Sequence, residues 1–199
     1  MSDTYYTLSG PSKGIYKEKM SKFLAFAHPV ESAKEAKDVV ARYRKEYYDA
    51  RHVCWAYMIG TARTEFLSND DGEPSGTAGK PILGQINSFN LTNVMIVVVR
   101  YFGGIKLGTS GLIVAYREAA REAIGAGEIV ERHEMTEIGF TFPYLSMNDV
   151  MRAVKDPEIK VLSQEFDNSC RMAVSIRADH ADALRSRLGD IDGVAFEES

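Results

Sequence analysis

Residues 94–111 read VMIVVVRYFGGIKLGTSG, and this stretch decides the fold of the first half of the chain. It begins with an apolar run, residues 94–99, that is rich in β-branched side chains. Such a run predicts a central strand that is covered on both faces. The glycine-rich turn at residues 103–111 leads into a helix predicted over residues 110–124. The turn is therefore expected at the N-terminus of a helix.

Weaker signals on either side of this stretch predict the other elements of the first half. Alternating apolar side chains predict strands within residues 15–30 and at residues 52–59, the latter paired with residues 64–67. Ser32 and Glu35 have the spacing of a capping box, so a helix is expected to begin near Ser32. A shorter helix is expected over residues 80–89.

The second half has a simpler pattern of alternating strands and helices. Its order is β-α-β-β-α-β, with Ser146 and Asp179 as the expected N-caps of the two helices. We place the boundary between the halves within residues 127–132. The sequence thus predicts an α+β protein with two domains, residues 1–130 and residues 131–199.

Composition and charge narrow the function. The chain has 199 residues, of which 45% are hydrophobic and 26% charged, a mixture typical of a globular protein. The longest apolar run is too short to span a bilayer, and the cysteines Cys54 and Cys170 do not form a disulfide framework. We therefore expect a cytoplasmic protein with no membrane association.

The charge is distributed unevenly along the chain. Residues 1–130 contain 16 Lys and Arg against 14 Asp and Glu, whereas residues 131–199 contain 8 against 14. This balance predicts no broad electrostatic footprint for nucleic acid. A local basic patch on the first half remains compatible with it, while the second half would repel a phosphate backbone.

Two segments carry the side chains from which a site is built. Residues 70–79 read DDGEPSGTAG. Asp71 and Glu73 can hold a metal or act as acid and base, and the glycines let backbone N–H groups converge on an anion. The alternative is that the acids are solvated, or cap nearby N–H groups and hold the loop in shape.

The second segment is the turn after the central strand. Free N–H groups at a helix N-terminus suit a phosphate or carboxylate, Arg100 and Lys106 add charge, and Tyr101 and Phe102 can stack on a base. The alternative is that the glycines serve only close packing. The turn matches neither the Walker A nor the Rossmann pattern. The candidate anion-binding or nucleic-acid-binding residues are Arg100, Tyr101, Phe102, Gly103, Gly104, Lys106, Gly108, Thr109 and Ser110.

The remaining reactive residues give weaker signals. His52 and Cys54 are two positions apart on a strand, about 6–7 Å, which is too far for a direct hydrogen bond. Cys54 is therefore expected in the core, and His52 is either a structural histidine or a second base beside Asp71 and Glu73. His28, His133 and His180 show no metal-ligand spacing, and two distant cysteines cannot supply a zinc site, so we assign no metal and no cofactor. A cation held by Asp71 or Glu73 stays open as part of the enzyme alternative.

Several stretches together resemble the YigZ/IMPACT family. They are SKF at residues 21–23, ARHVCWA at 50–56, DGEPSGTAG at 71–79, and VVRYFGG at 98–104 followed by Leu107 and Gly108. The matching loop comprises Asp71, Gly72, Glu73, Pro74, Gly76, Thr77 and Gly79. The resemblance covers about the first 125 residues strongly, and the second half looks like the smaller C-terminal domain of the family.

The resemblance implies a first domain like domain 2 of ribosomal protein S5, with a four-stranded sheet and helices on one face. It implies a second, ferredoxin-like domain similar to the last domain of elongation factor G. The family is described as a probable translation regulator.

Three functions are weighed. The leading hypothesis is a non-enzymatic module that binds RNA, the ribosome or a translation protein, with Arg100 and Lys106 contacting phosphate. The second is an enzyme acting on a phosphate-bearing substrate through Asp71, Glu73 and His52. The third is a scaffold for protein interactions. The sequence does not decide whether the chain forms a homo-oligomer.

Overall fold

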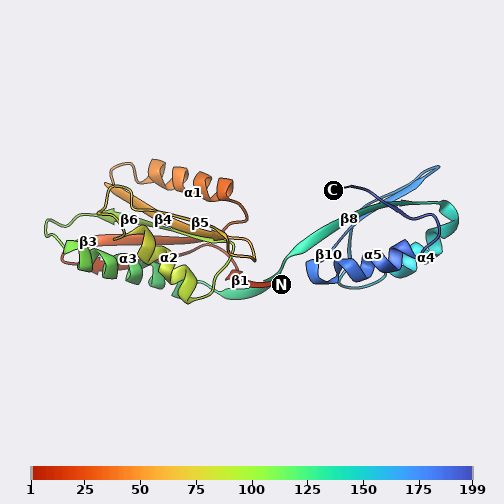
Figure 1. Cartoon of the computed structure of the whole chain (residues 1–199). Helices are drawn as coiled ribbons and strands as arrows, with labels where there is room; N and C mark the ends of the chain where they lie inside the picture. The colour runs from red at the N-terminus through yellow and green to blue at the C-terminus, as the bar shows by residue number, and fades with distance from the viewer. Residues whose placement is uncertain (1, 199) are drawn as a thin grey trace. The chain divides into compact units, whose positions relative to one another are not determined.

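The computed structural model describes residues 2–198 and shows a mixed α/β chain with several sheets and helices (Figure 1). It divides into two compact units. The larger unit is Tyr5–Arg132, and the smaller unit contains the described residues before Tyr5 and after Arg132.

The larger unit is built on a five-stranded antiparallel sheet with the strand order β2-β3-β6-β4-β5. Its strands are β2 Ser12–Glu18, β3 Ser21–Pro29, β4 His52–Ile59, β5 Glu65–Asn69 and β6 Val94–Tyr101. The central position of β6 confirms the prediction from its apolar run. The expectation of four strands, taken from the family resemblance, is wrong, because β5 adds a fifth at the edge.

Helices cover both faces of this sheet (Figure 1). α1 Ala33–Glu46 lies on one face, and α2 Gly79–Ser88 and α3 Gly108–Gly125 lie on the other. The expectation of helices on one face is therefore also wrong. The capping box at the start of α1 is only half formed. The Ser32 side chain accepts from the Glu35 N–H at 3.1 Å, while the Glu35 carboxylate accepts from the N–H of Glu31.

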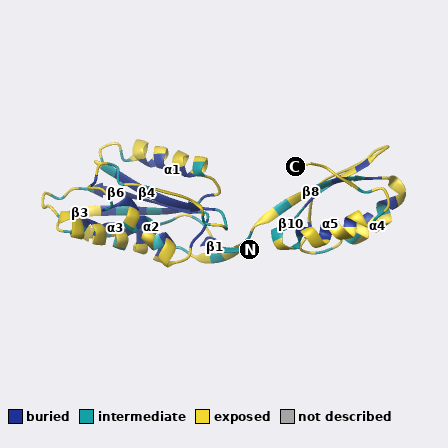
Figure 2. Cartoon of the chain, viewed as in Figure 1, coloured by how far each residue is buried: buried dark blue, intermediate teal, exposed yellow. Residues whose placement is uncertain are grey.

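Two layers of core follow from this arrangement, and Figure 2 shows the buried strands β4 and β6 below the exposed helix α1. Alternate side chains of β4 face opposite layers. Cys54 packs toward α2 and α3, while Trp55 packs toward α1, as the alternation in the sequence predicts. Both are buried, with exposed fractions of 0% and 7%.

A second, two-stranded sheet pairs β1 Thr4–Leu8 with β7 Ile129–His133. Tyr6 donates from its hydroxyl to Glu131 across this ribbon at 3.3 Å. The ribbon thus joins the first strand of the chain to the segment that follows α3.

The smaller unit has the predicted order of strands and helices. Its sheet has the order β11-β8-β10-β9, and its α-helices pack through a shared apolar core. The elements are β8 Met135–Phe142, α4 Met147–Ala153, β9 Lys160–Phe166, β10 Cys170–Arg177, α5 Ala181–Gly189 and β11 Ala195–Phe196.

Ser146 takes the predicted N-cap position of α4 but makes no capping bond, whereas the expected N-cap Asp179 of α5 is wrong. A single 3₁₀ turn precedes each helix, and neither helix has a side-chain cap. Ser146 instead donates from its hydroxyl to the Asp192 carbonyl at 2.6 Å. Asp179 lies one residue before the N-cap His180, and its carboxylate accepts from the Asp3 N–H.

Asp3 forms the main polar anchor of the smaller unit. Its side chain is 1% exposed, and Arg177 donates to both carboxylate oxygens, at 2.8 and 3.2 Å. The Asp179 N–H donates to the same group at 3.1 Å. The hydrogen bonds from Arg177 outweigh the opposing effect of burial and, with the Asp179 N–H, hold the pKa of Asp3 well below its usual range.

We expect Asp3→Asn to destabilise the smaller unit by about 2 kcal/mol at pH 7, since it weakens hydrogen bonds to a charged group. A depressed carboxyl pKa stabilises the fold fully above the unfolded pKa of about 4, and this contribution is lost as pH falls through the folded pKa. The difference in free energy of unfolding between Asp3→Asn and wild type should therefore become smaller below about pH 4.

Thermal unfolding followed by circular dichroism at pH 7 and pH 3 measures this difference. The single tryptophan, Trp55, lies in the larger unit, so its fluorescence transition is the internal control and should not move. An equal loss at both pH values would contradict the role of the Asp3 charge.

Candidate functional site

Asp70 organises the loop between β5 and α2. Its carboxylate accepts from three backbone N–H groups, those of Gly76 at 2.9 Å, Ala78 at 3.1 Å and Gly79 at 2.8 Å. Burial acts to raise the pKa of Asp70, but these three N–H groups outweigh it and hold the pKa below its usual value. The loop therefore closes around its own carboxylate rather than around an external anion.

Asp71 is also engaged within the protein. One carboxylate oxygen accepts from the Val53 N–H at 2.7 Å, and the other lies 3.2 Å from Nη2 of Arg44. Its own carbonyl lies 2.7 Å from Nδ1 of His52. Asp71 thus ties the loop to the start of β4, which matches the alternative in which the acids hold the loop in shape.

Glu73 lies at the centre of a buried polar network. Its side chain is 2% exposed, and Oε1 lies 2.5 Å from Nη1 of Arg100. The Tyr116 hydroxyl donates to the same oxygen at 3.1 Å, and Nε2 of His52 lies 3.3 Å away. Nδ1 of His52 thus faces the Asp71 carbonyl and Nε2 faces the Glu73 carboxylate, so the ring links the loop to the network.

Cys54 borders this network from the core side. Its thiol lies 3.0 Å from the Asp70 carbonyl and 3.4 Å from the Tyr116 hydroxyl, and it is fully buried. Burial raises the pKa of the Cys54 thiol far above its usual value. Burial also raises the pKa of the Tyr116 hydroxyl, and the neighbouring Cys54 and Glu73 raise it further. A thiol in these surroundings is unreactive, so the prediction that Cys54 belongs to the core is confirmed.

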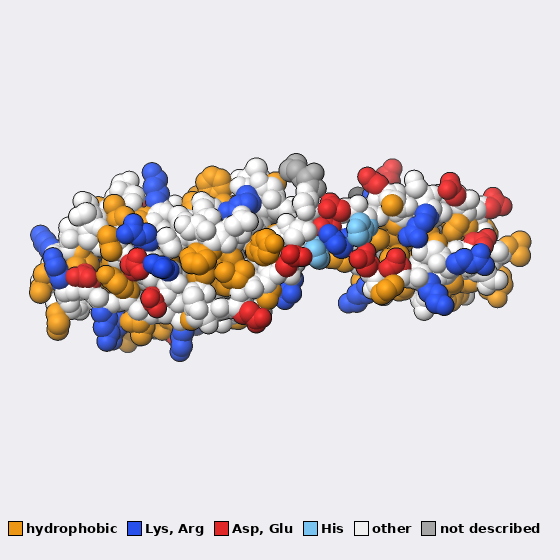
Figure 3. All heavy atoms as spheres, turned by 90° about the horizontal axis from the view of Figure 1, so that it is seen from below, with side chains coloured by type: hydrophobic (Ala, Val, Ile, Leu, Met, Phe, Trp, Pro, Cys, Tyr) orange, Lys and Arg blue, Asp and Glu red, His pale blue; other side chains and the backbone are white. Residues whose placement is uncertain are grey.

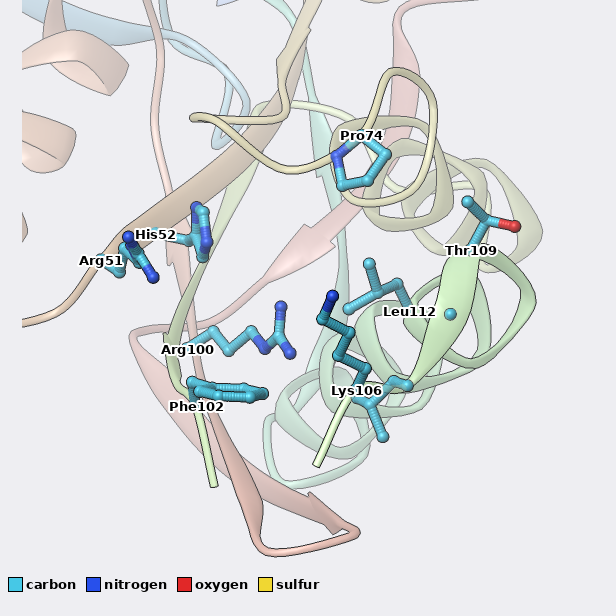
Figure 4. Close-up of a pocket in the computed structure, with 10 residues that line it drawn as sticks. Arg51, His52, Pro74, Arg100, Phe102, Lys106, Thr109 and Leu112 are labelled. Carbon is cyan, nitrogen blue, oxygen red and sulfur yellow. The ribbon is translucent and has the colours of Figure 1, made fainter. Parts of the chain in front are cut away.

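A cavity of about 380 Å³ lies in front of the network, between the β4 and β6 ends and the start of α3 (Figure 4). Its basic lining comes from Arg51, His52, Arg100 and Lys106. The rest of the lining is formed by Pro74, Phe102, Leu107, Gly108, Thr109 and Leu112. Among the described residues, no Asp or Glu belongs to the lining, so the exposed charge of this cavity is positive.

The first turn of α3 forms one side of this cavity. The N-cap is Leu107, which has no side chain able to satisfy the first N–H groups of the helix. Gly108 begins the helix with φ +71°, a conformation that favours glycine. Lys106 is exposed just before this turn. A positive helix end and a lysine on one cavity wall suit a phosphate or carboxylate.

Arg100 differs from the other cations of the cavity. It is 7% exposed, and its guanidinium carbon lies 5.6 Å from the ring centres of both Phe23 and Phe102. Its Nη1 contacts Glu73, whereas its buried Nε has no hydrogen-bond partner in the part of the chain that the structure describes. Most of its charge is therefore balanced internally, and Lys106 and Arg51 carry the accessible charge.

The other predicted anion-binding residues do not all meet in this cavity. Tyr101 packs on the α1 side of the sheet, where its hydroxyl donates to Asp49 at 2.8 Å, because successive strand residues point to opposite faces. Ser110 lines a separate hollow. A Cβ on Gly103 would collide with the Met20 backbone, so that glycine serves close packing, while Gly104 adopts φ +91°.

The glycines and Thr77 of the motif loop have structural positions. Gly72 and Gly76 adopt φ +85° and +79°, and a Cβ on Gly79 would lie 2.7 Å from the Asn69 nitrogen. Thr77 donates from its hydroxyl to the Pro74 carbonyl at 2.6 Å. Within residues 2–198, no three His, Cys, Asp or Glu side chains are arranged to hold a metal ion.

Comparison with known proteins identifies the family. The family model of the Impact N-terminal domain matches residues 19–124. The chain is 33% identical to the IMPACT family member YvyE of Bacillus subtilis over 191 residues, which are 96% of this chain and 88% of YvyE. The chain belongs to the IMPACT family. An IMPACT family member of Haemophilus influenzae is also 33% identical, over 85% of this chain and 84% of its own length.

A solved structure extends the likeness of this IMPACT family chain to both units. The crystal structure of a hypothetical protein aligns over 100% of both chains, with a TM-score of 0.76 and 27% identity. The family model itself covers β3 to α3, and so includes the Asp70 loop and the cavity. In the described part of the chain, no helix is long and apolar enough to cross a membrane.

Sequence reasoning missed three residues of this IMPACT family site. The sequence patterns assign no role to Asp70 or Tyr116, and they mark Arg51 only through the family resemblance. Asp70 and Arg51 stand beside motif residues, which is a signal that could have found them. Tyr116 lies on the buried face of α3, where nothing in the sequence marks its hydroxyl as a partner of Glu73.

Proposed function

We propose that this IMPACT family chain is a cytoplasmic translation regulator that works as a non-enzymatic module, binding a phosphate of RNA in the cavity beside α3. The translation role is what the family resemblance implies, and the match of the Impact N-terminal domain over residues 19–124 supports that resemblance. The observation that carries the binding role is the cavity itself. It joins the uncapped N-terminus of α3 to the exposed cations Lys106 and Arg51.

The internal partners of the acids favour binding over catalysis. Asp71 is held by the Val53 N–H, and Glu73 is held by Arg100 and Tyr116. A general base needs access to the proton that it removes, and a side chain that is 2% exposed behind an arginine lacks this access. These contacts support a structural role for both acids.

The architecture supports the fold assignments in the same proposal. The strand order β11-β8-β10-β9 with the β-α-β-β-α-β element order is that of a ferredoxin-like domain, which we assign to residues 131–199. We assign residues 1–130 to a domain like domain 2 of ribosomal protein S5, enlarged by one strand and by α1.

We expect Lys106→Ala with Arg51→Ala to weaken RNA binding about tenfold in low salt, because two cations leave the cavity. Fluorescence anisotropy with a labelled fragment of ribosomal RNA measures the change at two salt concentrations. The pair Lys34 and Lys37 on α1 gives the control, since its replacement with alanine changes the net charge equally.

Lys106→Arg should retain most of the affinity, because the positive charge is preserved at the helix end. Wild-type protein that binds no RNA at either salt concentration would overturn the proposal. If the Lys106 and Arg51 double variant binds RNA as tightly as wild type, the cavity is not the RNA-binding site.

A further inference from the structure

Three lysines lie on an edge of the larger unit, on the face of the sheet opposite the cavity. Lys13 and Lys17 point outward from β2, and Lys22 points outward from β3. We call Lys13, Lys17 and Lys22 the lysine strip; Lys19, in the turn between the strands, instead lines a hollow beside Glu18 and α3. None of the three makes an ion pair with any residue that the structure describes.

The strand register fixes the face on which the strip lies. Lys17 pairs directly with Lys22, and Lys13 pairs with Phe26, so these side chains share one face of the sheet. Phe26 stacks on Tyr43 of α1 with ring centres 4.5 Å apart, which identifies this as the α1 face. α1 covers β4 and β6, but it leaves the outer strand β2 uncovered on this side.

The composition of the strip is unusual in two ways. Two like charges stand directly opposite each other at Lys17 and Lys22, an arrangement that destabilises a strand pair. The acid of the same strand, Glu18, is turned to the other face, where the Tyr16 hydroxyl donates to it at 3.1 Å. Between the lysines lies Ile15, which is 55% exposed and pairs with Leu24.

The turn that carries Lys19 is strained. β2 and β3 are joined by two residues, Lys19 and Met20, with φ +45° and +68°. Hairpin turns of this shape normally contain Asn-Gly or Asp-Gly, since L side chains are disfavoured there. Gly103 packs closely against the Met20 backbone. Residues kept in such conformations cluster at binding sites.

We propose that the lysine strip binds the sugar–phosphate backbone of RNA, so that the larger unit contacts RNA on two faces. This inference rests on the proposed function. Side chains on one face of a strand recur about every 6.6 Å, so Lys13 and Lys17 offer charges roughly 13 Å apart along β2, with Lys22 beside Lys17. RNA is favoured as the occupant because the charge is unbalanced by acids, and because Ile15 and Leu24 supply apolar surface between the cations.

The face that carries α2 and α3 differs from the strip. Figure 3 shows that face of the larger unit, on which basic and acidic side chains are interspersed with hydrophobic ones. A surface of mixed sign gives a polyanion no continuous path. The lysine strip is therefore a separate positive path and not part of a general positive field.

The test compares Lys17→Ala/Lys22→Ala with wild-type full-length chain, using a labelled 12-nucleotide oligouridylate over a series of salt concentrations. Each phosphate contact contributes about 0.7 to the slope of log affinity against log salt for a single strand. The variant should therefore lose about 1.4 in this slope and bind roughly tenfold more weakly in low salt. Its unfolding midpoint should stay equal or rise, because a repulsive pair is removed.

The control is Lys34→Ala/Lys37→Ala on α1, which changes the net charge equally and should leave the slope unchanged. If wild type binds the oligouridylate and the strip variant shows the same slope of log affinity against log salt, the lysine strip does not bind RNA. This result would leave the proposed function standing. Wild-type protein without RNA affinity would overturn both. Polyglutamate that displaces the RNA at equal charge concentration would show that the strip recognises an acidic protein, which also overturns the RNA assignment.

Discussion

Glu73→Ala is expected to lower the free energy of unfolding of the larger unit by about 3–5 kcal/mol. The substitution leaves the guanidinium of Arg100 buried without its carboxylate, and Phe23 and Phe102 on either side offer no acceptor. It also leaves the Tyr116 hydroxyl without its acceptor. Urea unfolding followed by Trp55 fluorescence measures this loss within the larger unit, because Trp55 is the only tryptophan and is buried on β4.

Two further variants separate the buried charge from general damage. Glu118→Ala removes a more exposed acid from α3, and it should cost less than about 1 kcal/mol. Glu73→Leu with Arg100→Met removes both charges and should recover much of the lost stability. A cost below about 1 kcal/mol for Glu73→Ala would mean that the network contributes little to the fold.

A further substitution of Glu73 tests the rival enzyme hypothesis. Glu73 does not line the cavity, and its carboxylate is held behind Arg100. Folded Glu73→Gln should therefore bind RNA nearly as tightly as wild type. A phosphate-directed hydrolytic activity that disappears in Glu73→Gln, while the protein remains folded, would instead restore the catalytic role of this acid.

The local sequence predicted the sheet of the larger unit better than the family resemblance did. The run at residues 94–99 is apolar at every position, and such a strand requires cover on both faces. α1 supplies the second cover, with Val39, Val40 and Tyr43 packed in the same layer as Val97 and Val99. The arrangement that the resemblance implies, with helices on one face only, would leave this apolar layer exposed to solvent.

Helix starts in the smaller unit were predicted less well. Ser146 and Asp179 have the side chains of N-caps, yet each finds a tertiary partner, the Asp192 carbonyl for one and the Asp3 N–H for the other. A local pattern contains no information on residues that are 46 or 176 positions away. The short helices α4 and α5 then begin through a single 3₁₀ turn.

The candidate site shows the same limit. The pattern located the cavity wall, since a strand, a glycine-rich turn and a helix place Lys106 and Thr109 together. It did not reveal that Arg100 is neutralised by Glu73, because these residues are 27 positions apart and meet only when the Asp70 loop closes. It also grouped Tyr101 with Arg100, although neighbours on a strand point to opposite faces.

Asp70→Ala is expected to lower the free energy of unfolding of the larger unit by about 3 kcal/mol and to weaken ligand binding at the cavity. Hydrogen bonds to a charged group contribute about 1.5–3 kcal/mol each, but three bonds to one carboxylate are not additive. The N–H groups of Gly76, Ala78 and Gly79 lose their acceptor together. Pro74, which lines the cavity, then lies on a loop that is no longer closed.

Ser75→Ala is the matched control, because it alters an exposed side chain of the same loop and should change neither property. Asp70→Asn tests the charge. The pKa of Asp70 lies below its usual value, so its charge stabilises the fold fully above about pH 4, and this contribution is lost as pH falls through the folded pKa. Urea unfolding followed by Trp55 fluorescence should therefore give clearly different free energies of unfolding for wild type and Asp70→Asn at pH 7. The two values should converge below pH 4. If the difference in free energy of unfolding is equal at both pH values, the hydrogen bonds from the three N–H groups depend on the shape of the carboxylate and not on its charge.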